Sequence, residues 1–278
     1  MIIRGMKGLG DNIYQRAFIK SRQKPLWLET PWPELCSDIE GVKFIRPNTT
    51  LRTQRKNITR QSGAIWDRAP QQRAINIAYS QEGIIPGMRA RFGVEPAGFD
   101  LPPLPPSPVS GKYAVVRPVT VRAEWAAESR NPRPEYVLEA SRALREAGYT
   151  VVSVADLEDG KEWAVDPLPE ADITMHKGEL AVMHLLALVK NAAVVVGGIG
   201  WIVPAAIATG TPAWFICGGQ GGFNSPELIT DRNHMDLTKI GFAVPDKFCR
   251  CKQSRHQCDK RISGHREKFA EWMNGIHI

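Results

Sequence analysis

The sequence lacks the features that mark several large classes of protein. No stretch approaches the roughly 18 uninterrupted apolar residues of a membrane-spanning helix, and residues 1–11 carry no long apolar run of the signal-peptide kind. Cysteine is scarce: there are five, and an odd number argues against a secreted disulfide scaffold. No internal repeat is visible. These absences predict a cytoplasmic protein with no membrane span.

Length and proline content predict two domains. The chain has 278 residues, of which 43% are apolar, enough for substantial cores. Residues 101–111 contain five prolines, which exclude a helix or a central strand and favour a stiff extended linker. We therefore expect an N-terminal domain over residues 1–105 and a C-terminal domain over residues 106–278.

The second domain alternates between short apolar strands and helical segments. Strands are predicted at 112–116, 150–154, 193–196 and 211–217, and helices at 134–148, at 180–189 and from Pro204. This alternation is typical of βαβ units in a doubly wound parallel sheet.

The first domain begins in the same way. A strand at 1–4 leads through a glycine-rich turn to a helix at 13–21 and a strand at 24–28. The pattern weakens beyond Arg46, and residues 49–63 receive no assignment. The predicted fold class is α/β.

Positive charge is concentrated in one segment. Residues 43–73 hold eight basic residues and one acidic residue, Asp67, a net charge of +7 that equals the charge of the whole chain. A second basic cluster lies at 247–268. Such a run is either a solvated face or an anion-binding surface suited to DNA, RNA or a phosphorylated glycan.

A glycine-rich turn, Gly8-Leu9-Gly10-Asp11, joins the first strand to the first helix. Glycines let the backbone approach a ligand closely, and a helix N-terminus offers free N–H groups and partial positive charge. Asp11 is either a general base or, like Asn12, a cap of the helix.

A second turn of this kind, Gly197-Gly198-Ile199-Gly200-Trp201, precedes the helix near Pro204. Its N–H groups suit a diphosphate, although close packing of strand on helix also explains the glycines. The glycine-rich loop at 218–222 follows the next strand, at the sheet edge where ligands of α/β proteins bind. Arg117 and Arg122 follow the domain's first strand and are either diphosphate ligands or ordinary surface arginines.

Cys249, Cys251, His256 and Cys258 form a late cluster of metal-ligand residue types. Zinc takes thiolates and imidazole, so a structural zinc site is one interpretation, and reduced, partly buried thiols are the other. The spacing Cys-x-Cys is tighter than the common Cys-x-x-Cys.

These motifs together resemble the bacterial heptosyltransferase family, glycosyltransferases of the GT-B fold that build the lipopolysaccharide core. The resemblance covers most of the chain and is weak over residues 47–100. It rests on Gly8-Leu9-Gly10-Asp11 and on the stretch from Gly178 to Gly210-Thr211-Pro212. The cysteine cluster is similar to one found after the donor site of such proteins. The family implies two Rossmann-like lobes facing a cleft, Asp11 as catalytic base and an inverting reaction.

The chain departs from this family at one motif. The family usually has Asn-Asp-Thr-Gly-x-x-His after the strand, where this chain has Gly198, Ile199, Gly200 and Trp201, with Pro204 at the histidine position. The acidic residue and the histidine that help to hold the donor are absent. The donor sugar therefore need not be heptose.

The resulting hypothesis is a metal-independent glycosyltransferase with a nucleotide-diphospho-sugar as co-substrate and Asp11 as the base. Glu227 and His234 are further candidates for binding ribose or sugar hydroxyls. The predicted donor-binding set is Arg117, Arg122, Gly198, Gly200, Trp201, Gly219 and Glu227.

The basic first domain predicts an anionic acceptor. A hydroxymethylated pyrimidine in DNA, as modified by some bacteriophages, is slightly favoured over a phosphorylated lipopolysaccharide core, and a phage enzyme would act in the host cytoplasm. A non-catalytic nucleic-acid-binding protein and a nucleotide-sugar epimerase stay open. The predicted acceptor-binding residues are Gly10, Asn12, Arg52, Arg55, Lys56 and Trp66.

Overall fold

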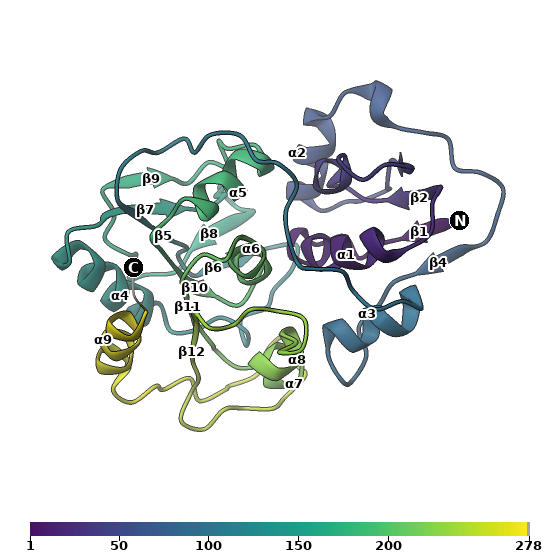
Figure 1. The fold of residues 1–278 in the computed structure, drawn as a ribbon. Coiled ribbons are helices and arrows are strands. Elements are labelled where there is room, and N and C mark those ends of the chain that lie inside the picture. The colour runs from purple at the N-terminus through teal and green to yellow at the C-terminus, as the bar shows by residue number, and fades with distance from the viewer. Residues whose placement is uncertain (277–278) are drawn as a thin grey trace. The chain divides into compact units, whose positions relative to one another are not determined.

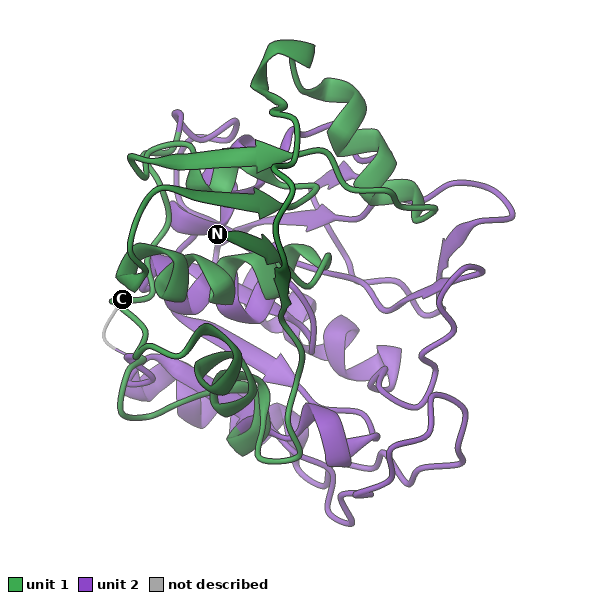
Figure 2. Ribbon diagram, turned by 90° about the vertical axis from the view of Figure 1, so that its right-hand side faces the viewer, with its two compact units in different colours: residues 1–104, 227–235 green, residues 105–226, 236–278 purple. Residues whose placement is uncertain are grey.

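The computed structural model describes residues 1–276, which form two compact units (Figure 2). Unit 1 comprises residues 1–104 and 227–235, and unit 2 comprises residues 105–226 and the chain from Asp236 onward. The break after Leu104 lies in the proline-rich segment. Residues 227–235 belong to unit 1, although they follow most of unit 2 in the sequence, and they are called the strap. One boundary along the chain therefore cannot separate the two units.

Unit 1 is built on a four-stranded parallel sheet in the order β3-β2-β1-β4. The strand order reverses between β1 and β4, because the chain first adds strands on one side of β1 and then crosses to the other. Ile2 pairs with Trp27 on one side and with Ala74 on the other. The strands are β1 (Ile2–Arg4), β2 (Leu26–Glu29), β3 (Val42–Ile45) and β4 (Ala74–Asn76).

Helix α1 is central to unit 1. It contacts α3 and the 3-10 helix η1, and the Phe18 ring stacks on the Phe92 ring with centroids 5.2 Å apart. The segment without a sequence assignment contains α2, whose buried residues are Gln54, Asn57 and Ile58. The helices are α1 (Leu9–Ser21), η1 (Pro33–Cys36), α2 (Arg52–Arg60), η2 (Gly63–Ile65) and α3 (Ile84–Phe92).

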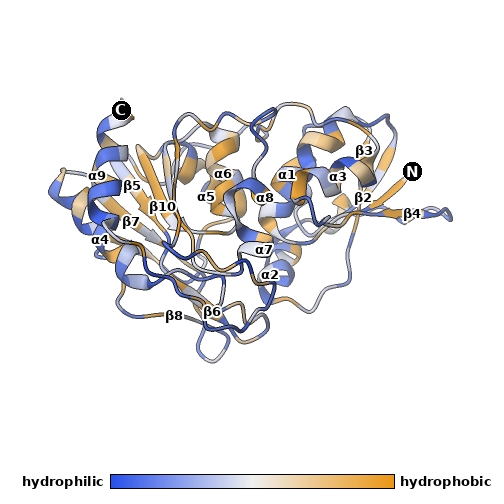
Figure 3. Ribbon diagram, turned by 90° about the horizontal axis from the view of Figure 1, so that it is seen from below, coloured by the Kyte–Doolittle hydropathy of each residue, from blue (hydrophilic) through white to orange (hydrophobic). Residues whose placement is uncertain are grey.

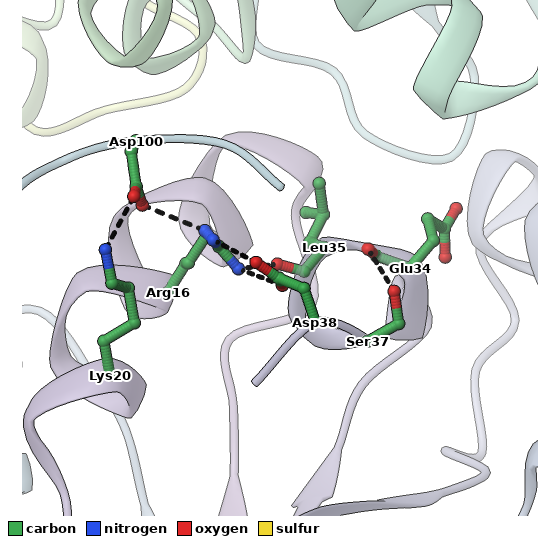
Figure 4. A network of polar contacts seen from close by, with 7 residues as sticks. All are labelled: Arg16, Lys20, Glu34, Leu35, Ser37, Asp38 and Asp100. Carbon is green, nitrogen blue, oxygen red and sulfur yellow. Dashed lines mark hydrogen bonds and ion pairs between the residues drawn. The ribbon is translucent and has the colours of Figure 1, made fainter. Parts of the chain in front are cut away.

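One buried arginine joins α1 to two distant segments of unit 1 (Figure 4). The Arg16 side chain is 3% exposed and binds both carboxylate oxygens of Asp38, at 2.7 and 2.8 Å. Its Nε donates to Asp100 at 3.1 Å. The hydrogen bonds from Arg16 hold the pKa of Asp38 below its usual value, and partial burial opposes this effect. The segment before the linker is thereby tied to α1.

The strap, which includes most of α8 (Pro226–Ile229), is held by specific contacts. The buried Tyr14 hydroxyl donates to the Ile229 carbonyl at 2.7 Å, and Arg89 pairs with Asp231 at 3.2 Å. Gly83 has a φ of 125°, and a Cβ there would lie 2.7 Å from the Leu228 carbonyl oxygen. Only glycine permits this approach.

Unit 2 contains a six-stranded parallel sheet in the order β12-β11-β10-β5-β7-β9. This is the order of a doubly wound Rossmann sheet, with its switch point between β5 and β10. The predicted doubly wound sheet is confirmed. The strands are β5 (Tyr113–Val116), β7 (Thr150–Val154), β9 (Ile173–Met175), β10 (Val194–Gly198), β11 (Ala213–Ile216) and β12 (Ile240–Ala243).

Helices cover both faces of this sheet (Figure 1). Helices α4 and α9 pack together over a core that includes Val116, Leu144 and Phe269, while α5 contacts α6. A two-stranded antiparallel ribbon, β6 with β8, stands apart from the sheet. The bounds are α4 (Pro134–Glu146), α5 (Val182–Lys190), α6 (Ile202–Thr209), α7 (Gly221–Asn224), α9 (His265–Gly275), β6 (Thr120–Arg122) and β8 (Glu162–Ala164).

The central strands of unit 2 are almost entirely apolar (Figure 3). Val194, Val195 and Val196 are fully buried, as expected for a parallel strand covered on both faces. Among residues 1–276, no helix combines the length and the apolar character needed to cross a membrane.

Candidate functional site

The turn after β1 is held rigidly by side chains of α1. Gln15 accepts from the Met6 N–H at 2.8 Å and donates to the Met6 carbonyl at 3.0 Å. The Asn12 amide donates to the carbonyls of Met6 and Gly8, and its oxygen accepts from Thr30 at 2.6 Å. Asn12 is 3% exposed. The Asn12 side chain thus makes its hydrogen bonds inside unit 1 and stabilises the turn, and its contact with the acceptor stays a prediction.

Asp11 lies in the first turn of α1 and is half-buried. Gly8 occupies the N-cap position of α1, so neither Asp11 nor Asn12 is the cap residue. The Tyr79 hydroxyl donates to Asp11 Oδ1 at 2.7 Å. A Cβ on Gly8 would lie 2.5 Å from Asp11 Oδ2, so a side chain there would displace the carboxylate. Gly10 is the neighbouring residue of the same helical turn.

The other predicted acceptor residues lie on α2 and beside β3. Arg52, Arg55 and Lys56 lie on α2, where Arg55 is exposed and the other two are partly buried. Trp66 forms a parallel bridge with Phe44 of β3 and is partly exposed. The segment that leads into α2 contacts the turn after β1, where the Lys7 amine donates to the Asn48 carbonyl at 2.5 Å.

The switch point of unit 2 brings predicted donor residues together. Arg117 follows β5 and donates its backbone N–H to Val196 of β10 at 2.9 Å. Arg117 Nη1 lies 3.9 Å from the position of a Cβ on Gly200, two residues before α6 begins. Trp201 occupies the cap position of α6. A guanidinium and a helix N-terminus therefore meet at the edge where α/β sheets bind ligands.

The charge around Arg117 is unbalanced. The pKa of Arg117 is lowered to about 10, chiefly by burial and also by the charges of Arg122 and Arg130, while Glu162 acts in the opposite direction. Arg122 Nε pairs with the buried Glu162 carboxylate at 2.8 Å. Two neighbouring guanidiniums thus repel the charge of Arg117, and one carboxylate attracts it. An anion bound here would relieve this repulsion.

Some predicted glycines pack against protein rather than lining open space. A Cβ on Gly198 would lie 3.0 Å from Pro132 Cδ, and one on Gly218 would lie 2.2 Å from the Asn131 carbonyl oxygen. Gly219 donates its N–H to Ser129 at 2.7 Å, and a Cβ there would lie 2.3 Å from Cys258 Sγ. Gly219 thus packs beside the cysteines, and its contact with the donor stays a prediction.

Glu227 and His234 lie in the strap of unit 1, whereas the other predicted donor residues lie in unit 2. His234 Nδ1 lies 3.0 Å from Asp231 Oδ2, and its Nε2 lies 3.5 Å from Glu95 Oε2. His234 thus takes part in the polar network that holds the strap. The structure does not group Glu227 with Arg117 and Gly200 in one unit.

The four residues of the cysteine cluster, Cys249, Cys251, His256 and Cys258, converge as the sequence predicts. Their ligand atoms lie within 4.8 Å of one another. Three thiols and one imidazole match the donor set of tetrahedral zinc or thiolate-bound iron.

The glycine-rich loop at 218–222 wraps the cluster. Gly221 N–H donates to the Cys249 carbonyl at 2.8 Å and Gly222 N–H to the Cys251 carbonyl at 3.1 Å. The Gln220 backbone N–H donates to the sulfurs of Cys251 and Cys258, and its φ of 55° is left-handed. Backbone donors of this kind stabilise metal thiolates and orient them.

Three residues of these sites were not predicted. Tyr79 follows the three-residue strand β4, and Glu162 lies in the three-residue strand β8. Arg130 lies in an irregular segment. None belongs to a periodic pattern or motif, so the sequence offered no signal for them.

Comparison with known proteins bears on the fold. No protein-family model and no curated protein sequence matches the chain. The iron-containing dodecameric glycosyltransferase TibC of enterotoxigenic E. coli H10407 matches with a TM-score of 0.63 and 14% identity over 99% of this chain and 75% of TibC. A structure of TibC holds ADP-D-β-D-heptose.

Two further solved structures cover nearly the whole of both chains. The E. coli ADP-heptose lipopolysaccharide heptosyltransferase II has a TM-score of 0.56 and 12% identity over 98% of this chain and 97% of its own. A family 9 glycosyltransferase of Veillonella parvula DSM 2008 has a TM-score of 0.54 and 9% identity over 98% and 95%. The chain has the fold of these glycosyltransferases, with two Rossmann-like units of the GT-B type.

Proposed function

We propose that the chain is a glycosyltransferase that moves a sugar from a nucleotide-diphospho-sugar to an acceptor hydroxyl. The observation that carries this proposal is the position of Arg117 beside Gly200 at the switch point of unit 2. The fold shared with TibC and the heptosyltransferases supports it, and the TibC structure with ADP-D-β-D-heptose suggests the class of donor.

The leaving group is a nucleoside diphosphate. As the glycosidic bond breaks, negative charge grows on its terminal phosphate. Arg117 and the N–H groups at the start of α6 stabilise that charge, with Arg122 next to them. Because cationic side chains supply this stabilisation, the proposed reaction requires no bound metal ion.

Asp11 is the proposed general base. A carboxylate in the first turn of a helix is stabilised by the helix dipole, and Asp11 lies partly exposed at the carboxyl end of β1. It removes the proton of the acceptor hydroxyl as the oxygen attacks the anomeric carbon. A single direct displacement of this kind inverts the anomeric configuration.

The cysteine cluster holds a structural metal ion in this proposal. Cys249, Cys251, Cys258 and His256 supply the ligands, and the ion would tie the loop at 218–222 to the segment 249–258. Zinc fits this donor set, and iron is the alternative because TibC is described as iron-containing.

Two acceptors are considered for the proposed reaction, and the preferred version has an anionic glycan as the acceptor. This reverses the order inferred from the sequence, because the similar structures include heptosyltransferases of lipopolysaccharide. Hydroxymethylated DNA is the second candidate, favoured by Arg52, Arg55 and Lys56 on α2. A bacteriophage origin would belong to this second version.

The test is mass spectrometry of acceptors incubated with the protein and a panel of ADP-, UDP- and GDP-sugars. A sugar-sized mass gain on a phosphorylated core oligosaccharide would support the preferred version, and a gain on hydroxymethylated DNA would support the second. Donor hydrolysis without transfer would establish that the protein uses the donor and would mean that its acceptor is neither of these two. No gain and no hydrolysis with any donor would contradict the proposed activity.

If DNA is the acceptor, the variant Arg52→Ser/Arg55→Ser/Lys56→Ser should bind DNA more weakly, with a flatter dependence on salt. Fluorescence anisotropy at several salt concentrations would measure this. Unchanged binding would remove the basis for the DNA version.

A further inference from the structure

We propose that Tyr79 is a positioning residue that orients the carboxylate of Asp11 and sets the pH at which it works as a base. The inference rests on the proposed function of Asp11. It adds a residue that no motif in the sequence indicates, just after a strand that pairs with β1.

The topology of unit 1 brings the two residues together. Strands β1 and β4 are neighbours on either side of the point where the strand order reverses. Asp11 follows β1 and Tyr79 follows β4, so both stand at carboxyl ends beside that reversal. The Ile77 N–H donates to the Arg4 carbonyl at 3.0 Å, which extends the pairing toward Tyr79. Such a switch point is the usual ligand site of an open α/β sheet.

The backbone that carries Tyr79 is packed tightly on α3. A Cβ on Gly87 of α3 would lie 2.7 Å from the carbonyl carbon of Tyr79 and 2.4 Å from the Ser80 nitrogen. A tight turn follows, in which Ser80 and Gly83 exchange backbone hydrogen bonds at 3.3 and 3.4 Å. The backbone is therefore fixed, although the Tyr79 side chain is 53% exposed.

The hydrogen bond determines what Tyr79 does to Asp11. Its hydroxyl donates to Asp11 Oδ1 at 2.7 Å, which holds the carboxylate in one orientation and favours its ionised form. Burial, together with the charge of Asp11, raises the pKa of Tyr14. The Tyr14 hydroxyl, however, donates to the Ile229 carbonyl. Of these two tyrosines, Tyr79 donates to the proposed base.

The test compares the wild-type protein with Tyr79→Phe, which keeps the ring and removes only the hydroxyl. The control is Glu82→Gln, an exposed position in the same segment. With the donor sugar that the wild type hydrolyses or transfers, we expect kcat of Tyr79→Phe to fall about ten-fold. The acid limb of its pH profile should move up by about half a pH unit or more. Donor KM and melting temperature should stay near wild type.

A second measurement separates this inference from the proposed function. Carboxyl-carbon NMR, with the Asp11 signal assigned through Asp11→Asn, follows the ionisation of Asp11 without any substrate. The Asp11 titration midpoint should move to higher pH in Tyr79→Phe and stay in place in Glu82→Gln. An unmoved midpoint, or an active variant with unchanged kcat and acid limb, would overturn the role of Tyr79. A wild type without activity on any donor would instead overturn the proposed function.

Discussion

A Cβ atom on Gly219 would lie 2.3 Å from the sulfur of Cys258, well inside van der Waals contact. Gly219→Ala should therefore push Cys258 out of the cluster and lower the metal content of the purified protein. Elemental analysis by mass spectrometry would measure this. Gly98→Ala is the matched control, since nothing lies within 4 Å of its Cβ position. Full metal content in Gly219→Ala would contradict the proposed packing.

Removal of the metal should loosen the loop at 218–222. Its N–H groups donate to the carbonyls of Cys249 and Cys251, and these carbonyls lie on the segment that the ion would hold. Hydrogen–deuterium exchange before and after chelation should show faster exchange in this loop and unchanged exchange in β5. Equal protection with and without the metal would show that the loop is stable by itself.

Arg117→Lys should weaken donor binding about ten-fold. Lysine keeps the charge but loses the planar fork that binds a diphosphate in two places. Calorimetric titration with a nucleoside diphosphate would measure the effect, and a nucleoside without phosphate should bind the variant and the wild type equally. Arg133→Lys, at an exposed position, is the control. An unchanged diphosphate affinity would place the donor elsewhere.

Asp11→Asn should abolish turnover and leave donor affinity intact. The amide has nearly the same shape but cannot accept the acceptor's proton, so a loss of about a hundred-fold or more is expected. Steady-state kinetics and donor titration check the two halves of this prediction. Asp67→Asn, an exposed position in unit 1, should behave as wild type. Turnover retained in Asp11→Asn would assign the base to another residue.

The ion pair between Arg16 and Asp38 predicts a pH dependence of stability. Arg16 lowers the pKa of Asp38 in the folded state, so the pair stabilises the fold above the unfolded pKa of about 3.9. This contribution is lost as the pH falls through the lower folded pKa. Asp38→Asn should therefore cost about 1–2 kcal/mol at pH 7.

Urea unfolding at several pH values between 7 and 3 checks this expectation. The difference between wild type and Asp38→Asn should shrink toward the acid end. A constant difference across that range would mean that the charge of Asp38 contributes little. Asp67→Asn again serves as the control, because Asp67 is exposed.

The sequence predicted the first strands and the first helix of unit 1 and the central strands of unit 2, but not the part of unit 1 that contains α2, and the difference has a physical reason. A central strand of a parallel sheet is buried on both faces, so it appears in the sequence as a continuous apolar run, such as 194–196. Helix α2 buries Gln54 and Asn57, which are polar. Asn57 is satisfied by the Pro31 carbonyl and by Glu34, both far away in sequence. No local pattern reveals such partners.

The residues of the candidate sites also divide into those that the sequence could place and those that it could not. Arg117 and Gly200 could be placed at one sheet edge because both follow predicted parallel strands, and that rule is local. The approach of Tyr79 to Asp11 depends on β4 pairing with β1, a strand order that the sequence does not specify. The placement of Glu227 in unit 1 depends on the return of the strap, which no motif marks.

The strap also constrains the order in which the protein folds during its synthesis. Chain elongation makes N-terminal segments available first, and domains commonly fold as they emerge. Unit 1 cannot do so completely, because the carbonyl that binds Tyr14 and the carboxylate that binds Arg89 belong to residues 229 and 231. These residues leave the ribosome only after five of the six strands of the second sheet. A nascent chain that stops before residue 227 therefore lacks the segment that completes the first unit.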